Sequence, residues 1–222
     1  MQRIRTVLFD LDGTLADTAP DLAAALNKLL AEEGRAHLAF ERIRPVVSHG
    51  STGLLRLGFG ITPDADGFEA LRSRLLAHYA RNLCRETCLF PGIPEVLEVL
   101  HQRGIVWGIV TNKPAFLTEP LLARLRLDHP PACVVSGDST QNRKPHPEPM
   151  LFACAIARAQ PSESLYVGDA ERDIRAGREA GMRTLVALFG YIGENENPAH
   201  WGADGMVRAP LEILEWIDSE TG

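Results

Sequence analysis

Two aspartates, Asp10 and Asp12, directly follow a run of β-branched and apolar residues in the stretch TVLFDLDGTLADT, positions 6–18. In an extended segment, residues i and i+2 point to the same side of the chain, so both carboxylates can flank one phosphorus atom. Asp10 would attack as the nucleophile. Asp12 would protonate the leaving alkoxide and later deprotonate the water that hydrolyses the aspartyl phosphate. The spacing therefore predicts phosphoryl transfer with the two roles divided.

Further polar residues lie beside the later apolar runs of the chain. They are Thr111, Asn112, Lys144, Asp169 and Asp173. Ligands of open parallel sheets bind at the carboxyl ends of the strands, so we expect these side chains to converge on Asp10 and Asp12. Asp173, which precedes an apolar residue, also suits a helix N-cap, and the two roles are compatible.

Four aspartates in one pocket, Asp10, Asp12, Asp169 and Asp173, would repel one another unless a cation joined them. Oxygen ligands favour a hard ion, and Mg²⁺ is the usual one in phosphate chemistry. With Lys144, Mg²⁺ and one protonated aspartate, the charges balance and a phosphate dianion is tolerated. Donors at Thr111 and Asn112 would then hold the phosphate oxygens.

Composition and missing motifs narrow the function classes. The 222 residues carry a formal net charge of −6 without a basic cluster, which disfavours a general nucleic-acid binder. No stretch approaches the ~18 apolar residues of a membrane span, so we expect no membrane partner and a cytoplasmic location. Neither GxGxxG nor GxxxxGK[ST] occurs, which removes the main support for a dinucleotide or nucleotide P-loop site.

Near-continuous apolar runs predict a parallel sheet buried on both faces. The expected strands are residues 6–9, 106–110, 165–167 and 184–188, with a possible fifth at 133–135. Helical patterns separate them at residues 92–103, 115–125, 149–159 and 173–180. Alternating strands and helices predict an α/β fold with a Rossmann-like, doubly wound parallel sheet.

Residues 16–88 depart from this alternation, because they have helical periodicity and no convincing strand. The helical patterns cover residues 19–33, 41–47 and 68–83. The segment is too long for a simple connection, since most such connections take about 2 to 6 residues. We therefore predict a small helical cap domain at 16–88, inserted into a core domain formed by 1–15 and 89–222.

The set DLDGT, VTN, RKP and GDAERD, in this order, resembles the haloacid dehalogenase-like phosphatases over essentially the whole chain. The resemblance implies a small-molecule phosphomonoester substrate, Asp10 as nucleophile and Asp12 as acid and base. It also implies phosphate binding by Thr111 and Lys144 and Mg²⁺ binding by Asp10, Asp169 and the backbone carbonyl of Asp12. Asp173 would orient metal-bound water, and the helical insertion would be a cap whose closure excludes water.

The substrate is less well defined by the sequence. The overall pattern is similar to the phosphoglycolate phosphatase branch, whereas the tail FGYI…NPAHWGAD, residues 189–204, is similar to phosphatases that act on N-acetylmuramic acid 6-phosphate. Both substrates carry a phosphate and a carboxylate. The stretch SHGSTG, residues 48–53, is either a substrate loop or a plain interhelical turn, and in the first case His49, Ser51 and Thr52 would contact the leaving group.

Other functions share parts of this pattern. A phosphomutase has the same core motifs and differs by delaying the attack of water on the aspartyl phosphate. A non-enzymatic phospho-receiver also forms an aspartyl phosphate, but it carries that aspartate after its third strand and has no helical insertion. A dehalogenase lacks the second aspartate that Asp12 provides. For the oligomeric state we expect a monomer or a weak homodimer.

Overall fold

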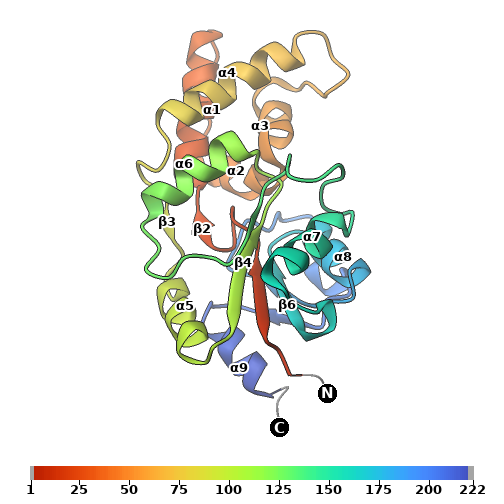
Figure 1. The fold of residues 1–222 in the computed structure, drawn as a ribbon. Coiled ribbons are helices and arrows are strands. Elements are labelled where there is room, and N and C mark those ends of the chain that lie inside the picture. Colours follow the sequence, from red (N-terminus) through yellow and green to blue (C-terminus); the bar gives the residue numbers. More distant parts are fainter. Residues whose placement is uncertain (1–2, 220–222) are drawn as a thin grey trace.

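The computed structural model describes residues 3–219 and contains a central six-stranded sheet whose neighbouring strands are all parallel (Figure 1). The strand order is β5-β4-β1-β6-β7-β8, so β1, the first strand of the chain, lies near the middle. The strands are β1 (Thr6–Phe9), β4 (Val106–Val110), β5 (Val134–Val135), β6 (Ser164–Gly168), β7 (Arg183–Ala187) and β8 (Gly205–Val207).

Successive residues of β1 fill two different cores, which explains its unbroken apolar sequence. Val7 and Phe9 pack in one cluster with residues of α5 and α9, whereas Leu8 packs in another with residues of α7 and α8. Helices therefore cover both faces of the sheet (Figure 1), as predicted for a doubly wound fold. The helices of this part are α5 (Ile93–Gln102), α6 (Ala115–Leu125), α7 (Glu148–Ala157), α8 (Glu171–Glu179) and α9 (Glu212–Ser219).

A helical segment lies above the carboxyl ends of the strands, opposite the two termini (Figure 1). A short antiparallel pair, β2 (Ala16–Asp17) with β3 (Cys88–Leu89), joins the segment to the sheet at its beginning and its end. The segment contains α1 (Ala19–Glu32), α2 (Phe40–Ile43), the 3₁₀-helix η1 (Arg44–His49), α3 (Gly50–Phe59) and α4 (Phe68–Arg81). Its assignment as a separate domain, residues 16–88, remains a prediction.

The sequence located most elements within a few residues, but several expectations need correction. Residues 16–88, expected to contain no strand, begin with the short strand β2 and end in the short strand β3. The helix expected at 41–47 is split into α2 and η1. The stretch 48–53 is neither a loop nor a plain turn, because Gly50–Gly53 form the first turn of α3. Gly53 is needed there because a Cβ at that position would press against the Cβ of His49 and the carbonyl of Val46, so close packing against η1 requires a residue without a side chain. The strand β8 and helix α9 were not foreseen.

Among residues 3–219, the structure has no helix with both the length and the apolar character that crossing a bilayer requires.

Candidate active site

Asp10 and Asp12 lie in the turn that follows β1, at the carboxyl edge of the sheet. Asp10 is buried and its Oδ1 accepts a hydrogen bond from the backbone N–H of Leu11 at 2.7 Å. Gly13 has φ +86°, and a Cβ at this position would overlap the carboxylate of Asp169. A glycine is therefore required for the chain to turn so close to another acidic residue.

Three carboxylates, Asp10, Asp169 and Asp173, meet at this edge, each offering one oxygen within 4.8 Å of the others. Asp169 follows β6, and Asp173 is in the first turn of α8, where its Oδ2 also accepts from the backbone N–H of Ala170. Asp173 is therefore not the N-cap that the sequence suggested, because Ala170 holds that position, but its side chain caps the start of α8 from the third helical position while it also joins the acidic cluster. All three carboxylates are buried.

Lys144 is the cation inside this cluster. Its Nζ lies 3.0 Å from Asp10 Oδ1 and 2.7 Å from Asp173 Oδ1, and it also donates to the carbonyl of Val110 and to the hydroxyl of Tyr166. One lysine cannot balance three buried carboxylates. Burial raises the pKa of Asp10 to about 6, with Lys144 opposing and Asp173 adding to the shift.

Asp169 is the second carboxyl of this cluster whose pKa is raised. Burial, followed by repulsion from Asp10 and Asp173, raises its pKa to about 7. Its Oδ2 accepts hydrogen bonds from Ser48 Oγ and from the backbone N–H of Tyr191, but its Oδ1 is buried without a hydrogen-bond partner among residues 3–219. An unsatisfied oxygen in an excess of negative charge fits a hard cation, so these residues suit a divalent metal ion.

The carboxylate of Asp12 does not join this cluster, which corrects the expectation of four aspartates around one point. Its Oδ1 instead accepts from Lys113 Nζ at 2.7 Å and from Thr18 Oγ1 at 2.5 Å. Burial disfavours the charge on Lys113, but the Asp12 carboxylate and Tyr79 outweigh it and raise the pKa of this lysine. The predicted metal contact of Asp12, which is through its backbone carbonyl, remains a prediction.

Thr111 and Asn112 follow β4 and line the same cavity as Asp10 and Asp12. Thr111 is buried and its hydroxyl accepts from the backbone N–H of Lys113, which leaves the hydroxyl proton to donate. Asn112 is tied to the loop of Lys144 by two hydrogen bonds, from its Nδ2 to the Lys144 carbonyl and from the Lys144 N–H to its Oδ1. Its side chain therefore positions Lys144, and the phosphate contact expected of it stays a prediction.

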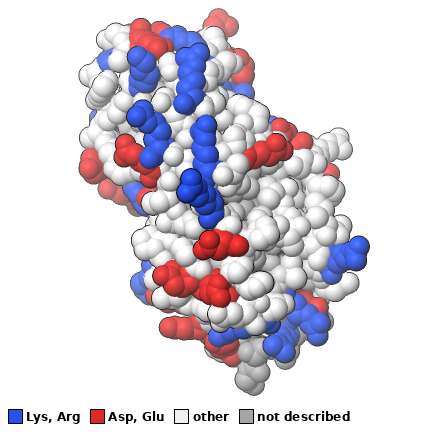
Figure 2. Space-filling view, turned by 60° about the vertical axis from the view of Figure 1, so that its left-hand side comes forward, with Lys and Arg blue, Asp and Glu red and all other residues white. Residues whose placement is uncertain are grey.

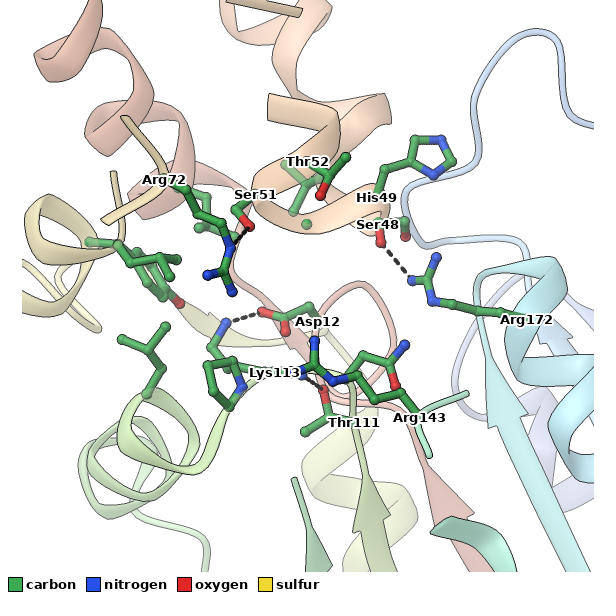
Figure 3. Close-up of a pocket in the computed structure, with 18 of the residues that line it drawn as sticks. Asp12, Ser48, His49, Ser51, Thr52, Arg72, Thr111, Lys113, Arg143 and Arg172 are labelled. Carbon is green, nitrogen blue, oxygen red and sulfur yellow. Dashed lines mark hydrogen bonds and ion pairs between the residues drawn. The ribbon is translucent and has the colours of Figure 1, made fainter. Parts of the chain in front are cut away.

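The cavity has a volume of about 580 Å³ and lies between the strand ends and the helical segment. Figure 3 shows Asp12, Thr111 and Lys113 on the strand side, with Ser51 and Thr52 from α3 on the opposite side. His49 also lines the cavity, but its ring is half-exposed and lies 3.9 Å from Glu196 Oε1. Thus, all three residues expected from the stretch 48–53 border the cavity.

Ser48 links the helical segment to the acidic cluster. Its hydroxyl donates to Asp169 Oδ2 at 2.7 Å, and its carbonyl accepts from Arg172 Nη2 at 2.6 Å. Arg172 precedes Asp173 in α8 and lines the cavity (Figure 3). The contacts of Ser48 place the segment directly on the carboxylates.

Sequence reasoning assigned no role to several residues of the site, namely Thr18, Ser48, Arg72, Lys113 and Arg172. Two had a usable signal, because Lys113 directly follows Thr111-Asn112 and Arg172 lies between Asp169 and Asp173. The others belong to the helical segment, where periodicity indicates helices but does not indicate which side chains face the sheet.

Comparison with known proteins agrees with this geometry. A family model described as haloacid dehalogenase-like hydrolase matches residues 7–187. The N-acetylmuramic acid 6-phosphate phosphatase of Pseudomonas putida is 43% identical over 98% of this chain and 97% of its own length. The phosphoglycolate phosphatase of Xanthomonas campestris pv. campestris is also 43% identical, over 95% of both chains.

A solved structure from Haemophilus somnus 129pt, described as a predicted phosphoglycolate phosphatase, matches with a TM-score of 0.85 and 28% identity, covering 97% of this chain and 99% of the other. The family match covers both the first strand and the last acidic motif, and the relatives align over nearly their full length. This chain therefore belongs to the haloacid dehalogenase-like hydrolases.

Proposed function

We propose that this chain is a Mg²⁺-dependent phosphatase that hydrolyses small-molecule phosphomonoesters through an aspartyl phosphate on Asp10. The observation that carries the proposal is the separation of two acidic environments at the end of one strand. Asp10 lies in a buried cluster with Asp169 and Asp173, whereas Asp12, two residues on, is held by Lys113 and Thr18. One environment suits a nucleophile beside a cation, and the other suits a proton carrier.

Each residue has a defined task in this reaction. Thr111 and Lys144 hold the phosphate while the carboxylate of Asp10 attacks phosphorus and the ester oxygen leaves. Asp12 gives its proton to that oxygen, then takes a proton from the water that cleaves the aspartyl phosphate and releases inorganic phosphate. Mg²⁺ bound by Asp10, Asp169 and Asp173 would supply the positive charge that lets a phosphate dianion approach these carboxylates. The hydrogen bond between Ser48 of the helical segment and Arg172 of α8 would help to exclude bulk water.

For the substrate, the named relatives point to two compounds with the same chemical features. Relatives 43% identical to this chain are named for two substrates, 2-phosphoglycolate and N-acetylmuramic acid 6-phosphate. Both compounds combine a phosphate ester with a carboxylate. We propose a substrate of this kind. The cytoplasmic location and the monomeric or weakly dimeric state remain predictions from the sequence.

The test is release of phosphate from p-nitrophenyl phosphate with and without Mg²⁺, in the wild type and in Asp10→Asn. The proposal requires metal-dependent turnover in the wild type and none in the variant, in which the nucleophile is lost. The ratio of kcat/KM on the two carboxylated substrates then ranks them, because specificity is a ratio of these values. A phosphomutase would instead consume a sugar phosphate without releasing an equal amount of free phosphate.

A further inference from the structure

The helical segment contributes one arginine to the cavity, and neither the motifs nor the proposed reaction assigns it a role. Arg72 lies in α4, its side chain is one-third exposed, and Figure 3 shows its guanidinium pointing into the cavity. Its Nε donates to Ser51 Oγ at 3.3 Å, and its Nη1 donates to Glu69 Oε2 at 3.2 Å. Ser51 thus fixes the direction of the guanidinium.

The charge of Arg72 is available to a ligand. Its partner Glu69 is 72% exposed, and an ion pair at such a surface holds the two side chains together only weakly. Its Nη2 has no hydrogen-bond partner within residues 3–219. A guanidinium with open donors in a fixed plane binds carboxylates well, because two parallel N–H groups match the two carboxylate oxygens.

The surroundings of Arg72 indicate the kind of molecule that brings the carboxylate. The cavity volume of about 580 Å³ lies within the ~300–1,000 Å³ typical of pockets for drug-sized ligands, which is more than a two-carbon acid fills. Apolar side chains also line the cavity, among them Leu22, Phe68, Leu76, Tyr79 and Leu117. Such a wall suits the carbon face of a sugar and an acyl group.

The helical segment also differs in charge from the rest of the chain. It contains as many basic as acidic residues between positions 16 and 88, although the whole chain has a net charge of −6. Figure 2 shows Lys and Arg side chains gathered over the upper, helical part of one face, with acidic side chains among and below them. The segment is therefore the part of the molecule better able to accept a second anionic group.

We propose that Arg72, oriented by Ser51, binds the carboxylate of a phosphorylated sugar acid whose phosphate lies at Asp10. The proposal rests on the proposed phosphatase function and adds to it the substrate class and the residue that selects it. Arg72 belongs to the helical segment and not to the strand ends that hold the phosphate, so it determines specificity and takes no part in bond cleavage.

The experiment compares Arg72→Gln with Arg81→Gln, which removes an equal charge from the exposed end of the same helix, outside the cavity lining. The substrates are N-acetylmuramic acid 6-phosphate, N-acetylglucosamine 6-phosphate, which lacks the lactyl carboxylate, and p-nitrophenyl phosphate. R72Q is expected to lower kcat/KM about 10- to 100-fold on the acid alone, the effect of losing a charge-assisted hydrogen bond. R81Q is expected to change none of the three. Equal melting temperatures of the two variants would establish that both fold.

Equal losses of R72Q on the acid and on its neutral analogue would overturn the proposal, since Arg72 would then act on the phosphate or on the fold. If the wild type hydrolysed 2-phosphoglycolate faster than the sugar acid phosphate, the inference from the cavity volume to a sugar acid would be overturned. If the wild type hydrolyses none of the esters, the proposed function fails instead. The role of Arg72 in binding is then tested by calorimetry. The D10N variant should bind the sugar acid phosphate more tightly than the D10N/R72Q variant does.

Discussion

Asp10 and Asp12 are the same residue type two positions apart, and their surroundings give them different chemistry. Asp10 is buried against Asp173 and Lys144, with its pKa raised to about 6 by burial. Asp12 is partly exposed to the cavity and accepts hydrogen bonds from Lys113 and Thr18. A nucleophile must stay in place beside the cation, whereas a proton carrier must reach both the leaving oxygen and water.

The division of roles can be tested with Asp12→Asn and p-nitrophenyl phosphate. The p-nitrophenolate leaving group needs no proton, so phosphorylation of Asp10 should continue while hydrolysis of the aspartyl phosphate slows about 10²- to 10⁴-fold. Stopped-flow measurement should show a burst of about one p-nitrophenolate per enzyme, followed by slow turnover. D10N should give no burst, and a D12N enzyme with undiminished steady-state turnover would contradict the assignment.

The raised pKa values predict how the metal-free protein responds to pH. Asp169, with its pKa raised to about 7, holds its proton more tightly when folded than when unfolded. Its contribution to stability is therefore complete below about pH 4 and is lost as pH rises toward and through 7, by up to about 1.4 kcal/mol per pH unit. In EDTA, urea unfolding should show lower stability at pH 8 than at pH 6. The difference should shrink in Asp169→Asn and persist in Asp66→Asn, which changes an exposed aspartate.

Mg²⁺ should stabilise the wild type at pH 8 and have little effect on Asp169→Asn, because the ion offsets the same repulsion that the substitution removes. Equal stabilisation of both proteins by Mg²⁺ would place the ion elsewhere.

At the scale of single residues, the sequence predicted the site residues whose positions are set by the main chain. Asp10, Thr111 and Asp169 each directly follow a strand, so the sheet alone brings them together. The partners of Asp12 were not predictable in this way. Thr18 reaches Asp12 because the chain turns back after Gly13, so that Ala16 forms an isolated bridge with Asp12. Lys113 reaches Asp12 by the length and direction of its side chain.

At the scale of elements, a residue of the C-terminal tail supports the start of the helical segment. The hydroxyl of Tyr191 accepts from the backbone N–H groups of Thr18 and Ala19, at 2.6 and 3.0 Å, and donates to Asp17 Oδ1. It thereby satisfies N–H groups at the beginning of α1, a task usually done by the N-cap side chain. The hydroxyl of Thr18 is free for Asp12 as a result.

Tyr191→Phe is therefore expected to lower the free energy of unfolding by about 1–3 kcal/mol, because buried N–H groups lose their acceptor. It should also slow turnover, since Thr18 positions Asp12. Tyr79→Phe is the matched control for stability, because the hydroxyl of Tyr79 is buried without a hydrogen-bond partner among residues 3–219. Urea unfolding of both variants makes the comparison, and equal destabilisation would contradict a special role for the hydrogen bonds of Tyr191, because any buried hydroxyl would then count equally.

Elements with strong periodicity or unbroken apolar sequence were predictable, and short or glycine-rich ones were not. The bounds of β1, β4 and α6 agree with those expected. The helix α3 was missed because Gly50 and Gly53 resemble turn residues, whereas Gly53 serves close packing against η1. The strand β8 has only three residues, and it is a strand because it pairs with β7. Local sequence does not reveal such a pairing.

At the scale of the whole molecule, the helical segment contacts the acidic cluster directly through Ser48. Both partners of Ser48, Asp169 and Arg172, belong to the sheet side of the site. These hydrogen bonds exist only while the segment lies on the strand ends, so a phosphate analogue that favours this arrangement should strengthen them.

Hydrogen exchange measures this effect. Mg²⁺ with vanadate should slow amide exchange over residues 44–52, at η1 and the start of α3, relative to Mg²⁺ alone. Exchange in α9, which lies at the opposite end of the molecule, should not change (Figure 1). Uniform slowing throughout the chain would indicate general stabilisation and contradict a specific movement of the segment.

The pairing of β2 with β3 has a consequence for how this molecule can be rebuilt. Ala16 lies opposite Leu89 and Asp17 opposite Cys88, so the chain enters and leaves the helical segment through two adjacent strands. Residues 19–87 can thus be excised and replaced by a short connection, or exchanged for another insertion, which keeps Thr18 beside Asp12 and does not re-route the strands that carry Asp10, Thr111 and Asp169. Such a graft would transfer substrate selection to a new enzyme while the strand-end residues of the hydrolytic site are inherited.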